Sequence, residues 1–222
     1  GKHHGTENPY DRGFDRYFGL RDGACNFFNP GKQREGEPKP AQKRRNRAWC
    51  IDDKTYQPYS PPEKDFYTTD YFAKYAINYL DQYAKETKPF FLYLAFNAPH
   101  DPMMAWPDDI AKYQGKYLVG YDAIRKARYK RMLDMGLIDK KTFELSPREK
   151  KSWDDLSEEK KKTEDRRMAV YAAMIDRMDQ NIGKVLAKIK EIGKTENTLV
   201  IFCSDNGGSA EVVNIGKGEI GN

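Results

Sequence analysis

The chain has 222 residues, of which 39 are lysine or arginine and 34 are aspartate or glutamate. The net charge of +5 is too small to require nucleic acid or a membrane surface as a partner. No apolar run approaches the roughly 20 residues that a membrane-spanning helix needs, and no secretory signal stands at the start. The three cysteines, Cys25, Cys50 and Cys203, form no C-x-x-C pair, so we assign no disulfide.

Residues 1–67 are predicted to be rich in loops. The stretch "NPYDRGFDRYFGLRDGACNFFNPG" alternates aromatic residues with Gly, Pro, Asn and Asp. This composition is typical of packed irregular structure, because disordered segments are poor in aromatic residues. The basic run "KPAQKRRNR", residues 39–47, fits either an exposed loop or a docking site for an anionic substrate or polymer.

Residues 70–86 predict an amphipathic helix, because apolar side chains recur there at three- and four-residue steps. The stripe consists of Phe72, Tyr75, Ala76, Tyr79, Leu80 and Tyr83. Thr68, Thr69 or Asp70 could cap its first turn. The apolar run 90–96 then predicts a strand buried on both faces, as in a parallel sheet.

Residues 103–163 are polar and charged and predict a solvated helical insertion, which agrees with a hydrophobic share of only 38%. A long helix follows, ending before Gly193. Its apolar stripe is Met168, Tyr171, Ile175, Met178, Ile182, Val185, Ile189 and Ile192. Residues 198–203 predict a second short strand. The alternation of helices and strands indicates an α/β fold with a mostly parallel sheet flanked by helices.

Polar residues follow both predicted strands at the edge where open α/β sheets bind ligands. The first strand leads to His100, and the second leads to Asp205 and Asn206. Carboxylate and amide oxygens suit Ca²⁺ or Mg²⁺, and two glycines follow them. Asp-Asn-Gly is also ordinary turn chemistry, and a single histidine after a strand is often structural. These residues alone therefore leave both interpretations open.

The stretch "GKHHG" places Lys2, His3 and His4 together, and His100 is the only other histidine. Lysine supplies a fixed positive charge, while histidine can donate to an oxyanion or transfer a proton near neutral pH. This combination of residues favours a site for an anionic group.

Four stretches resemble the sulfatase family, specifically its arylsulfatase branch within the alkaline-phosphatase-like superfamily. "GKHHG" resembles the family's G-K-W-H-x-G signature, and "DRGFDRYFG" resembles the R-G-F-D stretch that follows it. "KPFFLYLAFNAPHDP" is similar to the family strand that ends in P-H-x-P. The segment from "MAVYAAMIDRMDQNIG" to "TLVIFCSDNGG" is similar to its helix, strand and D-N-G sequence. The four occur in the family's order along nearly the whole chain.

The resemblance implies hydrolysis of sulfate esters by a formylglycine nucleophile, made from Cys or Ser in a C/S-x-P-x-R motif. It also implies a divalent cation, Ca²⁺ with Mg²⁺ as an alternative, held by Asp205 and Asn206. Lys2 matches the lysine that bridges formylglycine and sulfate. His4 matches the histidine that contacts the formylglycine hydroxyl and helps to expel sulfate. His100 matches the histidine that binds sulfate near the leaving oxygen.

The chain departs from the family pattern in two ways. His3 stands where the family usually has tryptophan, and no C-x-P-x-R or S-x-P-x-R motif is present. The acidic metal ligands near the family's start and its second sulfate-binding lysine are also absent, since the surroundings of Lys217 do not match. We therefore expect an internal fragment of a catalytic domain that is inactive alone. We divide it into 1–67 (active-site loops), 68–102 (helix and core strand), 103–163 (charged insertion) and 164–222 (helix, core strand and metal loop).

Two other functions stay open at this point. One is a phosphatase or phosphodiesterase of the same superfamily, although such sites usually need more histidines. The other is a non-catalytic relative that binds sulfated glycans through its basic run. The resemblance implies a small-molecule or saccharide sulfate ester as substrate, and export to the periplasm, the extracellular space or the lysosome. We expect no nucleic acid partner and no membrane span, and the sequence does not fix the oligomeric state.

Overall fold

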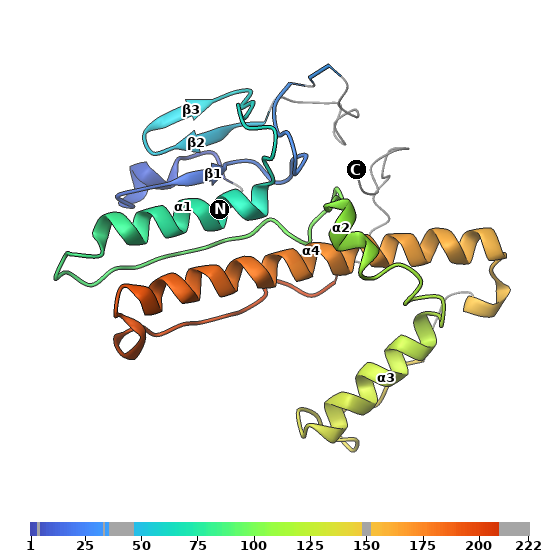
Figure 1. Cartoon of the computed structure of the whole chain (residues 1–222). Helices are drawn as coiled ribbons and strands as arrows, with labels where there is room; N and C mark the ends of the chain where they lie inside the picture. Colours follow the sequence, from blue (N-terminus) through green and yellow to red (C-terminus); the bar gives the residue numbers. More distant parts are fainter. Residues whose placement is uncertain (4, 33, 36–46, 148–151, 209–222) are drawn as a thin grey trace.

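The computed structural model describes residues 1–3, 5–32, 34–35, 47–147 and 152–208 (Figure 1). The strands are β1 (Phe18–Leu20), β2 (Trp49–Ile51) and β3 (Lys54–Tyr56). The α-helices are α1 (Thr68–Tyr83), α2 (Pro107–Ala111), α3 (Tyr121–Asp134) and α4 (Glu158–Glu191). Three short 3₁₀ helices complete the described elements, η1 (Pro9–Arg12), η2 (Trp153–Asp155) and η3 (Thr195–Asn197).

The three strands form a small antiparallel sheet in the order β1-β2-β3. Phe18 pairs with Ile51 across β1 and β2. The sheet packs against α1 through aromatic rings, with the centroids of Phe18 and Phe72 6.2 Å apart and those of Trp49 and Phe72 5.6 Å apart. The sequence did not predict this sheet, because strands of three residues are too short to show an alternating pattern.

Helix α1 lies between the sheet and α4 (Figure 1). The predicted stripe is confirmed, since Phe72, Ala76 and Leu80 are buried. The face towards α4 carries the small side chains Ala73 and Ala76, which form one apolar cluster with residues of the last turns of α4. The order of layers is therefore sheet, α1, α4.

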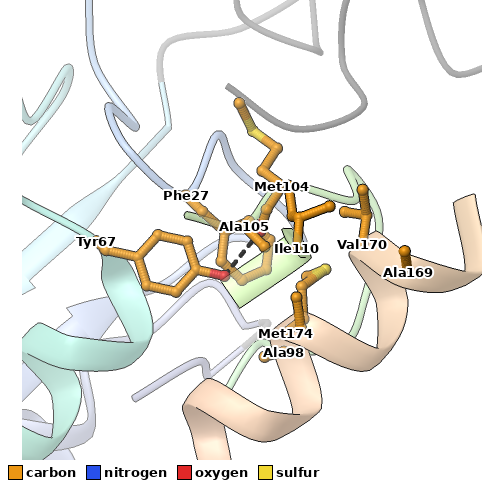
Figure 2. Close-up of a cluster of buried hydrophobic side chains, with 10 residues drawn as sticks. Phe27, Tyr67, Ala98, Met104, Ala105, Ile110, Ala169, Val170 and Met174 are labelled. Atoms are coloured by element: carbon orange, nitrogen blue, oxygen red, sulfur yellow. Dashed lines mark hydrogen bonds between the residues drawn. The ribbon is translucent and has the colours of Figure 1, made fainter. Parts of the chain in front are cut away.

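A second apolar cluster joins α2 and the preceding loop to the first half of α4 (Figure 2). Tyr67, just before α1, donates a hydrogen bond from its hydroxyl to the carbonyl oxygen of Met104 at 2.7 Å. The ring of Tyr67 is fully buried. This cluster fixes the loop between residues 97 and 106 to α1 and to α4.

The predicted stripe of α4 is confirmed in its second half and wrong in its first half. Val185 and Ile189 are buried, whereas Tyr171 and Ile175 are each 37% exposed. The first half instead buries Ala169, Val170, Ala173 and Met174. Small side chains let the α2 cluster approach the helix closely there. Gly193, at φ +70°, ends the helix as predicted.

The two predicted core strands, 90–96 and 198–203, differ from the expectation. Within the described residues both are extended but neither pairs in a strand ladder, because no neighbouring strand offers its backbone groups. Phe91 is 79% exposed and Ile201 is 76% exposed, so the expected burial on both faces is wrong here. One face of 90–96 does pack, since Leu92 and Leu94 contact the cluster between α1 and α4. The chain is an incomplete α/β fold with a small sheet and flanking helices.

The charged insertion is largely exposed. None of the residues of α3 is buried, and the helix projects away from the rest of the described chain (Figure 1). Among the described helices, none combines the length and the apolar character needed to cross a membrane.

Candidate active site

The stretch that begins the chain lies between β1 and the extended segment 90–96. The backbone N–H of Lys2 donates to the carbonyl oxygen of Ala95 at 2.7 Å, and that of His3 donates to Leu20 at 2.8 Å. A side chain at position 19 could not be accommodated, since a Cβ on Gly19 would lie 1.7 Å from the carbonyl oxygen of Gly1. Close backbone contact on both sides therefore fixes the position of Lys2.

The "DRGFDRYFG" stretch is held by the turn between β2 and β3. The Arg16 Nε donates to both carboxylate oxygens of Asp52 at 3.1 Å, and the Tyr17 N–H donates to Asp52 Oδ1 at 2.9 Å. The Tyr17 hydroxyl in turn donates to the carbonyl oxygen of Gly1 at 2.9 Å. Burial of that hydroxyl raises the pKa of Tyr17, so it stays protonated and a donor. This motif therefore holds the residue before Lys2 in place through the Tyr17 hydroxyl.

His100 lies in the turn that follows 90–96, and its side chain is exposed. Its Nδ1 lies 2.7 Å from the carbonyl oxygen of Asp101. A carbonyl can only accept, so the hydrogen is on Nδ1 and the neutral ring has its lone pair on Nε2. His100 can therefore accept or deliver a proton through Nε2.

The backbones of Lys2 and His100 are both bonded to the extended segment 90–96 or to the turn that follows it. Lys2 is bonded to Ala95, and the His100 N–H donates to the carbonyl oxygen of Asn97 at 2.9 Å. The buried thiol of Cys25 lies beside the start of this turn, since Asn97 Nδ2 is 3.9 Å from its Sγ. Burial raises the pKa of Cys25 to about 12, with the Arg47 and Lys2 charges opposing it. Because the thiolate is the reactive form of cysteine, a thiol with such a pKa is a poor nucleophile, and we do not assign Cys25 that role.

Asp205 and Asn206 lie at the end of the second extended segment and are exposed. In Figure 1 this segment and 90–96 run in the same direction, as the sequence predicts. Within the described ranges, no hydrogen bond or ion pair joins Asp205 to Lys2 or His100. The described residues also contain no group of three His, Cys, Asp or Glu side chains that could hold a metal ion.

The donor chemistry of this loop nevertheless suits a hard cation. Asn206 Nδ2 donates to the carbonyl oxygen of Gly207 at 2.8 Å, which leaves its Oδ1 as the free acceptor. The Ser204 hydroxyl donates to the Asn206 carbonyl at 2.7 Å and closes the turn. The Asp205 carboxylate and Asn206 Oδ1 are therefore available as two oxygen ligands.

Some residues singled out in the sequence lie outside the described residues. They are the predicted catalytic residue His4, the rejected candidate Lys217 and most of the basic run 39–47. The roles of Lys2, His100, Asp205 and Asn206 stay predictions.

Thr68 and Asn97, near the site, make a contact that the sequence did not reveal. The expected capping of α1 is wrong, because its N-cap is Tyr67 and no side chain caps the helix. The hydroxyl of Thr68 instead donates to Asn97 Oδ1 at 3.1 Å. The two threonines at the start of α1 were the only hint in the sequence. Threonine at a helix start predicts a capping residue, however, and not a hydrogen bond to a residue 29 positions away.

Several known proteins are similar to this chain. The sulfatase family model matches residues 1–221. An uncharacterized sulfatase of Schizosaccharomyces pombe is 37% identical over 210 residues, which cover 92% of this chain and 36% of that protein. An arylsulfatase of Klebsiella aerogenes is 33% identical over 203 residues, covering 90% of this chain and 41% of that protein. A solved structure of i-CgsB in complex with k-i-k-neocarrahexaose has a TM-score of 0.47 at 21% identity, over 86% of this chain and 32% of that one.

The chain belongs to the sulfatase family. It spans 36% and 41% of the length of the two curated relatives described above.

Proposed function

We propose that the protein containing this chain hydrolyses sulfate esters, and that the chain supplies the sulfate-binding part of its active site. The observation that carries the proposal is the bond from Lys2 to Ala95, on the segment that leads to His100. This backbone bond supports the proposal because it joins Lys2 to a residue five positions before His100, although the two are far apart in the sequence. The family match over residues 1–221 supports sulfate as the anion that they bind.

The chemistry assigns a separate task to each side chain. Transfer of a sulfuryl group builds negative charge on oxygen atoms, and fixed positive charge nearby stabilises it. Lys2 would bind a sulfate oxygen through its ammonium group. His100, with its Nδ1 hydrogen engaged by Asp101, would first take up a proton at Nε2 and then, as the imidazolium, deliver that proton to the leaving ester oxygen. His4 would assist the release of sulfate, as the family motif implies.

Asp205 and Asn206 would hold a divalent cation, Ca²⁺ or alternatively Mg²⁺. When bound, the cation supplies further positive charge for the sulfate oxygens. The nucleophile, a formylglycine in the family, would come from a part of the protein outside this chain. We accordingly expect the 222-residue chain to be inactive alone.

The substrate is proposed to be an aryl sulfate or a saccharide sulfate ester. The arylsulfatase relative makes an aryl sulfate the first compound to try. We also propose an exported location, as the family resemblance implies.

The test is a comparison of para-nitrophenyl sulfate and para-nitrophenyl phosphate as substrates of the full-length protein. We expect turnover of the sulfate in preference to the phosphate, loss of that turnover with a chelator, and its return with Ca²⁺. Preference for the phosphate would instead identify a phosphatase of the same superfamily. Binding of a sulfated glycan without any turnover would identify a non-catalytic relative, and either result would overturn the proposal.

A further inference from the structure

The loop that carries His100 is anchored at its first residue, Asn97. The Asn97 side chain is only 4% exposed, although the turn it begins is at the surface. Its Oδ1 accepts a hydrogen bond from the Thr68 hydroxyl at 3.1 Å, and its Nδ2 lies 3.9 Å from Cys25 Sγ. Both partners are themselves buried. The amide is thus held from two sides within the core.

This anchor is connected directly to His100. The His100 N–H donates to the Asn97 carbonyl oxygen at 2.9 Å, which closes the turn. The imidazole is then fixed by its own bond from Nδ1 to Asp101. Thr68 is the first residue of α1, and its N–H donates to the Phe27 carbonyl at 2.9 Å. Asn97 is therefore bonded through its side chain to the start of α1 and through its backbone to His100.

An apolar residue would serve better at position 97 if packing were its only task. A buried amide costs free energy unless its donor and acceptor are both satisfied. In return, a satisfied amide permits only one arrangement of the loop, whereas an apolar side chain tolerates several. The polar side chain at position 97 therefore fixes the orientation of the loop and does not maximise the free energy of unfolding.

We propose that Asn97, held by Thr68, is the positioning residue that orients His100 for proton transfer to the leaving oxygen. This inference rests on the proposed sulfate-ester hydrolysis. It assigns to Thr68 and Asn97 no contact with the substrate. Their loss should leave sulfate binding intact and misplace the proton donor.

The consequence is a dependence on the leaving group. A proton donor matters most when the leaving oxygen is strongly basic, as in phenyl sulfate, and least for an activated ester such as para-nitrophenyl sulfate. A misplaced His100 should therefore slow phenyl sulfate more than para-nitrophenyl sulfate. The ratio of the two rates does not depend on how much of the protein is folded. It thus separates a positioning defect from simple instability.

The experiment measures kcat and KM of the full-length protein on both esters for Thr68→Val, Asn97→Ala and His100→Ala. The matched control is Thr69→Val, because Thr69 is equally buried and its hydroxyl makes no hydrogen bond to Asn97. We expect kcat for phenyl sulfate to fall about tenfold more than kcat for para-nitrophenyl sulfate in Thr68→Val and Asn97→Ala, with KM nearly unchanged. The control should keep the wild-type ratio.

The outcomes distinguish this inference from the proposed function. If His100→Ala changes the ratio but Thr68→Val and Asn97→Ala do not, the positioning role is wrong and the proposed function stands. If His100→Ala leaves the ratio unchanged, or if the wild-type protein hydrolyses neither ester, the proposed role of His100 fails and the inference falls with it.

Asn97→Asp provides a second test at the same position, because it keeps the size and the acceptor for Thr68. It should retain a ratio closer to that of the wild type than Asn97→Ala.

Discussion

The ion-pair network between α2 and α4 predicts a large loss of stability in Asp109→Asn. Asp109 is only 3% exposed and accepts from Arg177 Nε at 2.7 Å and from Lys112 Nζ at 2.8 Å. The substitution keeps the size of the side chain but removes the charge and turns an amide N–H₂ towards one of the two cations. Among the described residues, Arg177 would then keep Asp70 as its one acidic partner, at 3.9 Å.

The magnitude follows from the burial of the pair. Removing one partner of a buried ion pair costs roughly 3–5 kcal/mol, because the other charge stays in the interior without compensation. The Arg177 side chain is 23% exposed and can be partly solvated, so we expect the lower end, about 3 kcal/mol. With an m-value of roughly 2 kcal/mol per molar urea, the unfolding midpoint should fall by about 1.5 M.

The assay is urea unfolding of the full-length protein, followed by fluorescence and circular dichroism. The matched control is Asp134→Asn, whose ion pair with Lys130 on α3 is exposed at both ends. An exposed pair contributes at most about 1 kcal/mol, so the control should unfold near the wild-type midpoint. Equal midpoints for Asp109→Asn and Asp134→Asn would refute the reasoning, because burial would then make no difference.

Two further predictions concern the buried polar groups near the loop 97–106. Tyr67→Phe leaves the Met104 carbonyl without its partner and should lower the free energy of unfolding by about 1–2 kcal/mol, measured in the same urea assay. Unchanged stability would show that water replaces the hydroxyl. Cys25, with a pKa of about 12 in place of 9.0, holds about a thousandth of the usual thiolate and should resist iodoacetamide until the protein unfolds, as peptide mapping would reveal. Because the pKa of Cys25 is higher in the folded state, its contribution to stability is fully present below pH 9.0 and is lost as the pH rises towards 12. Cys25→Ala should therefore reduce the loss of stability between pH 9.0 and pH 12. Rapid labelling of Cys25 in the native protein would contradict its burial.

The helices could be predicted from sequence because each buries one apolar face. The prediction for α1 was 70–86 and the helix is Thr68–Tyr83, with Phe72 and Leu80 buried as expected. The start of α4 was missed, since its first residues are charged and carry no apolar period. They are helical because Ser157 caps the helix and lysine and glutamate are good helix formers.

The two extended segments show that a local sequence pattern alone does not predict a paired strand. The runs 90–96 and 198–203 have the composition of buried strands, but a strand exists only with a neighbour that pairs with it. The pattern therefore located the segments and their direction but not their burial. The short strands β1–β3 were missed for the opposite reason, because their pairing depends on contacts such as that of Trp49 with Tyr56 and not on a local period.

The sequence motifs propose residues for the candidate site but do not indicate the contacts that hold them in place. The motifs named Lys2 and His100, and the structure adds that Ala95 is bonded to the first while Asn97 and Thr68 support the second. No local pattern connects Thr68 with Asn97, since their bond forms only when α1 packs beside the extended segment.

The central claim is that Lys2 and His100 act together on a sulfate ester. It is tested most directly by kcat/KM for para-nitrophenyl sulfate in full-length Lys2→Ala and His100→Ala, with the exposed Lys85→Ala as control for lost charge. We predict a fall of about 100-fold or more in each of the first two variants and no change in the control. Wild-type rates in both Lys2→Ala and His100→Ala would contradict the claim.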